Sequence, residues 1–452
     1  KLLSTHAHAA PMAIEDEVLS RITPTPAQRQ TVDHVVSTLL TRAAEKASQK
    51  RADLEVMLVG SVAKDTYVQE PDIDIFVLFP TEVERRDLEK IGLEIGRETL
   101  MGGGERYAEH PYIRGTWEGL EVDLVPCYHI KDPSMLRSSV DRTPFHTRYI
   151  KARLGEQQRG HVRLLKQFMK GVGVYGAEAK VQGFSGYLTE ILILKYGTFR
   201  EVLEAATRWR PGETLTLDGK GKKFDDPFVF YDPVDEGRNV ASALSLNSLA
   251  QFIYAAREYL KNPTMRFFFP RERCPLPVAR IKEIIQERGT ELLVIRLDRP
   301  DITDDDLYPQ LRRTLDGAVD MLENSGFKVY DREFHASDAI RLVIELESAT
   351  LPRAIRHDGP PAWIKNAQFF LDKWAGAGLS EPFLDNGRWV VMAERAYSDA
   401  SQLIETRLSQ AALGSSLRSL NGLHVTVGED TINEINKEAI SALLDKRKNW
   451  EI

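Results

Sequence analysis

Two aspartates open an otherwise apolar stretch, "DIDIFVLF", at residues 72–79. Because successive side chains of a β-strand point to opposite faces, Asp72 and Asp74 would lie side by side, with Ile73 and Ile75 on the other face. Two carboxylates at this spacing repel each other, so the pKa of one of them is expected to rise unless a cation lies between them. The stretch therefore predicts a metal site at the start of a strand.

A third carboxylate, Asp123, lies in "LEVDLVPCY" at residues 120–128, which also has the pattern of a strand. Three carboxylates that converge from two strands can hold two Mg²⁺ ions, one activating an attacking hydroxyl and the other stabilising a leaving phosphate. Glu121 would share a face with Asp123 by strand alternation, so it is the rival third ligand.

A turn that contains Gly60, Ser61 and Lys64 comes shortly before the aspartates. Glycine lets backbone N–H groups approach a phosphate closely, and a hydroxyl and an ammonium add donors and positive charge. The chain contains no G-x-x-x-x-G-K-[ST], and its G-x-G-x-x-G match at residues 171–176 follows a helical pattern rather than a strand. The turn and the carboxylates together predict a phosphate-binding catalytic site that is neither a P-loop nor a dinucleotide site.

The elements that must position these residues form a mixed sheet with helices. Apolar residues recur at helical spacing in residues 27–50 and 86–100, and strands are predicted at 54–60, 72–79 and 120–128. Helices are expected within residues 147–196 and at 247–260. The fold class predicted for this first part of the chain is therefore mixed α/β followed by a helical region.

The second part of the chain alternates again between helical and strand patterns. The predicted elements are a helix at 278–288, a strand at 291–297, a helix at 306–324, strands at 327–330 and 339–347, a helix at 363–374 and a strand at 388–394. After the first helix, this β-α-β-β-α-β order is typical of the split-βαβ, ferredoxin-like arrangement. No aromatic signature of an RNA-recognition motif is visible in it.

Composition narrows the class of protein. The 452 residues are 42% hydrophobic and 28% charged, as expected for a soluble protein of several domains, and no apolar run is long enough to span a bilayer. A net charge of −7 argues against a protein that coats nucleic acid through a broad positive field. The only two cysteines, Cys127 and Cys274, favour a reducing cytoplasm. Residues 1–12 are expected to be a tag or a disordered tail.

Several ordered blocks of the chain resemble the archaeal, class I CCA-adding enzymes. They are "GSVAKDTYVQEPDIDIFVLFP", "EVDLVPCY", "VDRTPFH", "VYGAEAKVQGFSGYL", "DPVDEGRNVA" and "RGTELLVIRLDRPDITDDDLYPQL". The resemblance implies an α+β multidomain protein with a polymerase-β-like nucleotidyltransferase head, a helical neck and body, and a ferredoxin-like, RNA-binding tail. The implied ranges are residues 13–146 for the head, 147–215 for the neck, 216–275 for the body, 276–395 for the tail and 396–452 for a segment returning to the body.

The resemblance also implies an activity, partners and site residues. The activity is template-independent addition of the 3′-terminal CCA of tRNA from CTP and ATP, with two Mg²⁺ ions, by a cytoplasmic homodimer without membrane association. Asp72, Asp74 and Asp123 match the metal ligands of the family. The positions that match nucleotide contacts, chiefly to the triphosphate, are Ser61, Lys64, His146, Lys166 and Tyr175, and Arg238 matches the arginine used to recognise the incoming base.

Two other functions fit the same sequence features. Another template-independent nucleotidyltransferase, such as a poly(A) polymerase or an oligoadenylate-synthase-like enzyme, would share the carboxylates of the head. An inactive RNA-binding protein could retain the fold, although the intact set of three aspartates argues against it.

Overall fold

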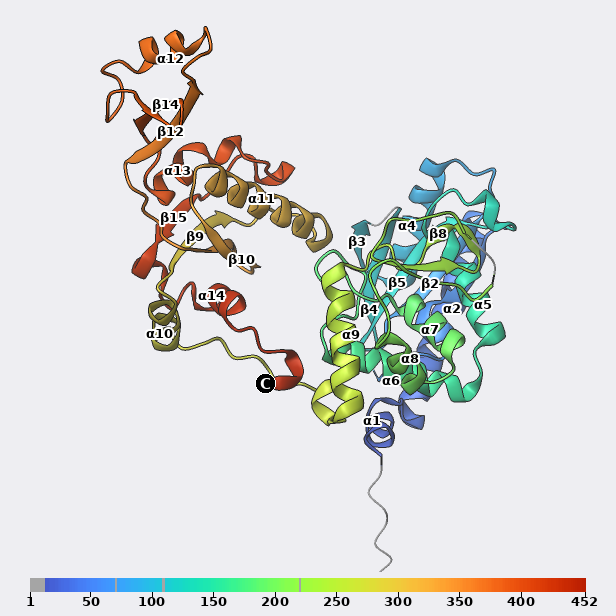
Figure 1. Cartoon of the computed structure of the whole chain (residues 1–452). Coiled ribbons are helices and arrows are strands. Elements are labelled where there is room, and N and C mark those ends of the chain that lie inside the picture. Colours follow the sequence, from blue (N-terminus) through green and yellow to red (C-terminus); the bar gives the residue numbers. More distant parts are fainter. Residues whose placement is uncertain (1–12, 70, 108–109, 219–220) are drawn as a thin grey trace, which may run out of the picture. The chain divides into compact units, whose positions relative to one another are not determined.

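The computed structural model describes residues 13–69, 71–107, 110–218 and 221–452, so the predicted tag or tail at residues 1–12 lies outside the described residues (Figure 1). The chain divides into two compact units. Unit 1 comprises Lys1–Glu272 with Lys448–Ile452, and unit 2 comprises Arg273–Arg447. The predicted head and neck ranges, and residues 216–272 of the predicted body range, fall in unit 1.

A five-stranded mixed sheet forms the first part of unit 1, in the order β1-β2-β5-β4-β3. Strands β2 and β5 are parallel, and the other neighbours are antiparallel. The mixed sheet predicted from the sequence is therefore confirmed. Its strands are β1 (Glu55–Val59), β2 (Ile73–Phe79), β3 (Gly104–Tyr107), β4 (Pro111–Trp117) and β5 (Leu120–Tyr128).

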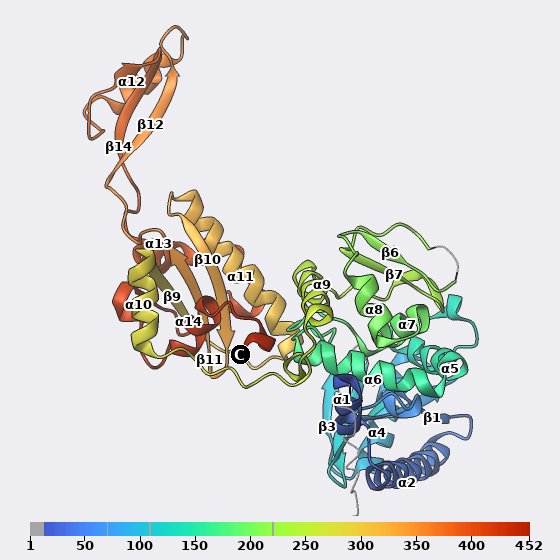
Figure 2. The same cartoon turned by 60° about the horizontal axis from the view of Figure 1, so that its bottom comes forward.

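Two helices, α2 (Pro26–Lys50) and α4 (Arg85–Leu100), pack against each other and cover one face of this sheet (Figure 2). Ile73 and Ile75 of β2 are fully buried in the core that α2 and α4 close. Strand alternation therefore places Asp74 on the opposite face. The apolar side chains of β2 hold the strand in the sheet, and the acidic side chains are left for the other side.

The rest of unit 1 is mainly helical. Its aromatic core joins Phe168, Phe252 and Tyr259, and Trp450 stacks on Phe267 with ring centroids 5.2 Å apart. The elements are α1 (Ile14–Ile22), α3 (Gly60–Ala63), α5 (Thr143–Arg153), α6 (Glu156–Gly171), α7 (Gly186–Tyr196), α8 (Phe199–Ala206), α9 (Leu246–Lys261) and a sheet of β6 (Glu213–Leu215), β7 (Phe228–Asp232) and β8 (Asp235–Asn239).

Unit 2 is built on a four-stranded antiparallel sheet in the order β10-β11-β9-β15. One apolar core joins this sheet to α11 and α13, and another joins it to α10 and α14, so helices cover both faces. The elements are α10 (Val278–Arg288), β9 (Glu291–Asp298), α11 (Asp304–Asn324), β10 (Val329–Ala336), β11 (Ala339–Leu346), α13 (Ala400–Arg407), β15 (His424–Val427) and α14 (Lys437–Leu444).

The predicted second half of the split-βαβ unit was wrong. The helix and strand predicted there are α12 (Ala367–Trp374) and β14 (Arg388–Glu394), and β14 pairs with β12 (Ala354–Pro361) and β13 (Phe383–Asp385) in a separate sheet (Figure 1). Instead, α13 and the short strand β15 complete the β-α-β-β-α-β order of the four-stranded sheet. Side-chain alternation identifies a strand but not its partner, so the sequence pattern could not make this distinction.

The C-terminal segment, residues 396–452, is divided between the two units. Of the range predicted to return to the body, residues 396–447 belong to unit 2 and only Lys448–Ile452 belongs to unit 1.

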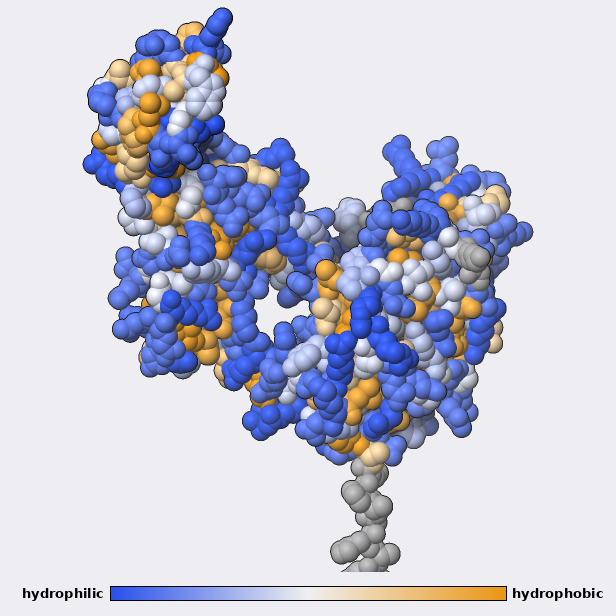
Figure 3. All heavy atoms as spheres, viewed as in Figure 1, coloured by the Kyte–Doolittle hydropathy of each residue, from blue (hydrophilic) through white to orange (hydrophobic). Residues whose placement is uncertain are grey.

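The small sheet with α12 exposes hydrophobic residues on its surface (Figure 3), namely Trp363, Phe369, Leu379 and Leu384. Among the described residues, no helix combines the length and the hydropathy needed to cross a membrane.

Candidate active site

The three predicted metal ligands meet on one face of the five-stranded sheet. Asp74 of β2 and Asp123 of β5 are register partners on adjacent parallel strands. Asp72 precedes β2 by one residue and shares the face of Asp74 through strand alternation. The structure thus brings together the two motifs that are separated by about fifty residues in the sequence.

Burial and charge repulsion both act on the aspartates of this face. Burial, followed by the negative charges of Asp123 and Asp72, raises the pKa of Asp74 to about 6. The pKa of Asp72 is also raised, mainly by burial, with Glu121 and Asp123 adding to the effect. These carboxyl groups carry more negative charge than their protein surroundings neutralise.

Arg114 supplies a cation to this group from the neighbouring strand β4. Its Nε and Nη2 donate to the two carboxylate oxygens of Asp123, each at 2.6 Å, in a bidentate ion pair. Glu121, the rival third ligand, is more exposed and lies 3.7 Å from Nη1 of Arg114. Asp123 is the better candidate because it alone is in register with Asp74.

The donor set suits Mg²⁺, although no group of three His, Cys, Asp or Glu side chains in the described ranges is arranged as a finished metal site. Carboxylate oxygens are ligands that Mg²⁺ prefers, and burial together with neighbouring carboxylates raises the pKa of Asp72 and Asp74, so a bound cation would favour their ionised forms. Both oxygens of Asp123 already accept from Arg114, so this guanidinium competes with a metal ion for the carboxylate.

The turn predicted to bind phosphate lies directly beside Asp74. Gly60 has a φ of +71°, and a Cβ at this position would lie 1.9 Å from Oδ2 of Asp74. Only glycine satisfies both the left-handed backbone and the close approach of the carboxylate. Ser61 follows in the short helix α3, and Lys64 caps it. Lys64 is close enough to lower the pKa of Asp74, against the larger effect of burial.

A buried ion cluster joins this turn to helices α6 and α7. The Nζ atom of Lys64 donates to Oε2 of Glu190 at 2.6 Å, and the hydroxyl of Thr66 donates to Oε1 at 2.6 Å. Lys166 of α6 lies 3.6 Å from the same carboxylate and donates to the carbonyl oxygen of Thr66 at 3.0 Å. Two of the predicted triphosphate ligands, Lys64 and Lys166, therefore share one counter-ion.

Tyr175 lies at the edge of the same region. Its side chain is half-buried, and the ammonium of Lys170 lies 5.4 Å from its ring centroid. Burial raises the pKa of its hydroxyl, with a further contribution from the charge of Glu190. The hydroxyl therefore stays protonated at neutral pH and can donate to an anion.

The last two predicted residues, His146 and Arg238, meet at Asp232. The Nε2 atom of His146 donates to Oδ2 of Asp232 at 2.8 Å, and Nη1 of Arg238 donates to the same oxygen at 2.9 Å. The ring of Tyr187 stacks on His146 with centroids 3.8 Å apart, and its hydroxyl donates to Oδ1 of Asp232 at 3.3 Å. Burial lowers the pKa of His146 against the opposing effect of Asp232, which favours the neutral ring.

Three parts of the chain match known families. Residues 40–146 match the nucleotidyltransferase domain, residues 160–269 the second domain of tRNA nucleotidyltransferase, and residues 288–428 the C-terminal domain of CCA-adding enzyme. The CCA-adding enzyme of Haloarcula marismortui is 38% identical over 441 residues, which cover 92% of this chain and 94% of that protein. The chain belongs to the archaeal CCA-adding enzyme family.

Other members of the CCA-adding enzyme family are similar to the same extent. The protein of Methanosarcina barkeri is 39% identical over 418 residues, with 89% of this chain and 91% of the relative covered. That of Methanothermobacter thermautotrophicus is 41% identical over 409 residues, with 87% and 88% covered. The similarity therefore extends over both units of the structure.

Two solved structures are similar to this chain, but less so than the CCA-adding enzymes are. One is CdnC of E. coli MS115-1 with ATP, 18% identical with a TM-score of 0.44 over 56% of this chain and 94% of that chain. The other is the Cid1 poly(U) polymerase with Mg and 3′-dATP, 14% identical with a TM-score of 0.43 over 55% and 94%. Similarity at this level bears on neither substrate nor mechanism.

Three residues that take part in the site of this family member were not predicted from the sequence. Arg114 has no motif of its own, and only the pairing of β4 with β5 places it opposite Asp123. Glu190 lies in an apolar helix, where an isolated acidic residue surrounded by leucine and isoleucine was the available signal. Asp232 begins the block "DPVDEGRNVA", but its partner His146 is far away in the sequence. The spacing of residues in the sequence does not show which polar side chains are buried in the fold.

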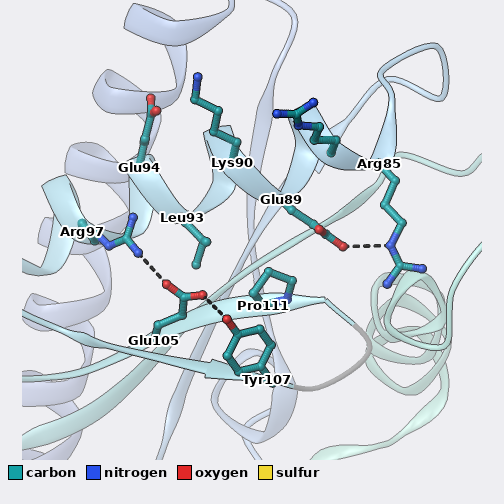
Figure 4. Close-up of a pocket in the computed structure, with 10 residues that line it drawn as sticks. Arg85, Glu89, Lys90, Leu93, Glu94, Arg97, Glu105, Tyr107 and Pro111 are labelled. Atoms are coloured by element: carbon teal, nitrogen blue, oxygen red, sulfur yellow. Dashed lines mark hydrogen bonds and ion pairs between the residues drawn. The ribbon is translucent and has the colours of Figure 1, made fainter.

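A groove of about 700 Å³ lies elsewhere in unit 1, between α4 and the β3-β4 hairpin (Figure 4). Several of its side chains form ion pairs and hydrogen bonds with one another, with Arg97 to Glu105 at 2.5 Å, Tyr107 to Glu105 at 2.7 Å and Arg85 to Glu89 at 2.8 Å. Because α4 covers the sheet face opposite to Asp74, this groove is not part of the carboxylate site.

Proposed function

We propose that this protein is a tRNA nucleotidyltransferase that builds or repairs the 3′-terminal CCA of tRNA from CTP and ATP. Three carboxylates on adjoining strands, beside a glycine turn that leads to a buried lysine pair, carry this proposal together with membership of the CCA-adding enzyme family. The carboxylates face the side of the sheet that α2 and α4 leave uncovered. A substrate with both a metal-binding and a polyphosphate part fits that combination of charges.

The side chains divide the work between the attacking group and the triphosphate. Asp72, Asp74 and Asp123 would hold two Mg²⁺ ions, which when bound lower the pKa of the attacking hydroxyl and neutralise charge on the leaving pyrophosphate. Lys64 and Lys166, with Ser61 and Tyr175, orient the triphosphate so that the tRNA 3′-hydroxyl meets the α-phosphate in line. Positioning and electrostatic complementarity supply most of the rate enhancement in such a site.

Arg238 is the proposed contact to the incoming base. Its guanidinium donates to Oδ2 of Asp232, which also accepts from Nε2 of His146, so the arginine side chain is restrained before a nucleotide arrives. The fixed fork of an arginine can donate to a ring nitrogen and a carbonyl oxygen of a base. His146 extends the same group towards the triphosphate.

The remaining expectations also belong to this proposal. We infer that unit 1 contains the head, neck and body, and that unit 2 is an RNA-binding tail on a ferredoxin-like sheet. A homodimer in the cytoplasm, with the acceptor stem and 3′ end of tRNA as its macromolecular partner, completes the proposed biological unit.

The product length and the order of bases test the proposed function directly. The purified protein is incubated with tRNA ending at the discriminator base, at the first C or at the second C, with CTP or ATP alone. The expected result is addition of C to the first two substrates with CTP and addition of one A to the third with ATP. A long A tract would identify a poly(A)-polymerase-like enzyme, and no incorporation of either nucleotide would refute the nucleotidyltransferase function.

A further inference from the structure

Glu190 is a fully buried carboxylate at the centre of the lysine cluster. It lies on α7, which Ser185 caps at its N-terminus and which packs against α6. Its two oxygens accept from Lys64 and Thr66, each at 2.6 Å, and Lys166 is 3.6 Å away. The carboxylate therefore ties together the turn after α3, helix α6 and helix α7.

The two lysines would repel each other without this carboxylate. Lys166 is almost completely buried, and burial lowers its pKa to about 8 against the opposing effect of Glu190. Lys64 and Lys170 add like charges that favour its deprotonation. One carboxylate between two ammonium groups leaves a net charge of +1 when both lysines are protonated, so the cluster still attracts an anion.

The geometry also leaves donors for a ligand. An ammonium has three N–H donors, and Glu190 takes one from Lys64, whose side chain is 9% exposed. Glu190 itself has no exposed surface. A phosphate can reach the lysine at the surface but cannot reach the glutamate behind it.

We propose that Glu190 is a positioning residue of the nucleotide site, which holds Lys64 and Lys166 charged and in place without contacting the triphosphate. This inference rests on the proposed function, in which both lysines bind the triphosphate. The carboxylate acts through the lysines, so its loss should weaken nucleotide binding more than it slows the chemical step.

The charge of Glu190 predicts a distinctive dependence on pH. The groups that face it are Lys64 and Thr66 from the turn, Lys166 from α6 and, further away, Tyr175 from the segment after α6. Removing the negative charge should lower the pKa of Lys166 further, so that it loses its proton at a lower pH. Nucleotide affinity should then fall as the pH rises through a range where the unaltered protein still binds.

The test compares Glu190→Gln with the unaltered full-length chain, using CTP and inorganic tripolyphosphate as separate probes. Gln preserves the shape and can still accept from Lys64, but it removes the charge. Dissociation constants are measured without tRNA at pH 6, 7 and 8.5, together with KM and kcat for CMP incorporation. We expect a loss of about tenfold in affinity for both probes at pH 8.5, a smaller loss at pH 6, and kcat reduced by less than about threefold.

Two variants serve as controls. Glu178→Gln removes an exposed glutamate whose charge also acts on Tyr175 but which has no contact with either lysine among the described residues, and it should bind both probes normally. Glu190→Asp keeps the charge on a shorter side chain, and it should show a pH profile of the normal shape with weaker binding. This variant keeps the proposal testable if Glu190→Gln does not fold.

The outcomes separate the two proposals. If the unaltered protein incorporates CMP and Glu190→Gln has normal dissociation constants at all three pH values, the positioning role is refuted and the proposed function stands. A change in the pH profile of Glu190→Asp as large as that of Glu190→Gln would also refute the role of the charge. If the unaltered protein incorporates neither nucleotide into any tRNA substrate, the proposed function itself fails.

Discussion

Replacing Asp74 by Asn should make the metal-free protein more stable while abolishing nucleotide incorporation. Asp74 lies against Gly60 on one side and in register with Asp123 on the other, so its ionised form is both poorly hydrated and repelled. An amide of the same shape removes the charge without opening a cavity. The substitution therefore separates the function of the carboxylate from its cost to the fold.

The size of this gain follows from the pKa. A rise from the ordinary value of 3.8 to about 6 corresponds to about 3 kcal/mol, since each tenfold change in protonation is worth about 1.4 kcal/mol. Because the side chain is partly exposed, solvent screening reduces the expected gain to about 2 kcal/mol. The folded-state pKa is raised, so the stability linked to this group is present below pH 3.8 and is lost as the pH rises through 6. The Asn variant has no carboxyl group to ionise, so it does not lose this stability. Its gain in free energy of unfolding over the unaltered protein should be complete above pH 6 and disappear towards pH 4.

The measurement is urea unfolding in EDTA at pH 5 and pH 8, with CMP incorporation measured in Mg²⁺ on the same preparations. Asp141→Asn is a matched control, because Asp141 is buried but accepts backbone N–H groups of Tyr128, Arg137 and Ser138. The NH₂ group of the substituted amide is itself a donor and would lie against these backbone N–H donors. This variant should therefore lose about 2 kcal/mol of its free energy of unfolding. If Asp74→Asn is no more stable than the unaltered protein at pH 8, the repulsion argument is wrong, and if it retains normal turnover, Asp74 is not a metal ligand.

Three further substitutions test other contacts of the site. Arg114→Gln removes the cation that is paired with Asp123, so it should destabilise the metal-free protein by about 1 kcal/mol and tighten Mn²⁺ binding in a direct titration. An unchanged affinity for Mn²⁺ would contradict this competition. Arg238→Ala should impair the affinity for CTP and ATP, or the choice between them, with little change in thermal stability, and unchanged kinetics with both nucleotides would leave it a structural residue. Asp232→Asn should cost about 3 kcal/mol because four donors, including the backbone N–H of Val234, lose a buried charged acceptor, and a calorimetric scan that shows no loss would refute this role.

The sequence predicted the catalytic sheet well because its signals are local. The alternation in "DIDIFVLF" defines both the buried face of β2 and the acidic face, and the same pattern recurs in β5. The spacing of two charges predicted that one pKa would rise, but burial, which the spacing does not show, is the largest cause of the rise at Asp74. Parallel pairing of β2 with β5 was the single long-range fact needed to bring Asp123 to the site, and the structure shows it.

The features that the sequence could not predict depend on which distant segments meet. Strand β15 has only four residues, so its pattern was too short to compete with β14 for a place in the main sheet of unit 2. Glu190 and Asp232 each have partners more than eighty residues away, and their importance comes from burial rather than from spacing. Arg114 is likewise an ordinary residue of an edge hairpin until the register sets it beside Asp123.

Arg114 and Glu190 hold equivalent positions on the two halves of the site. In the carboxylate half, Arg114 neutralises part of an excess of negative charge, and in the lysine half Glu190 neutralises part of an excess of positive charge. A nucleotide triphosphate with bound Mg²⁺ carries the complementary charges in one molecule, so it can compensate both halves at once. Arg114 is partly exposed and can move away from Asp123, whereas Glu190 is enclosed and must stay. The two counter-ions should therefore behave differently on substrate binding, with Arg114 exchanged for the metal and Glu190 retained beneath the phosphate.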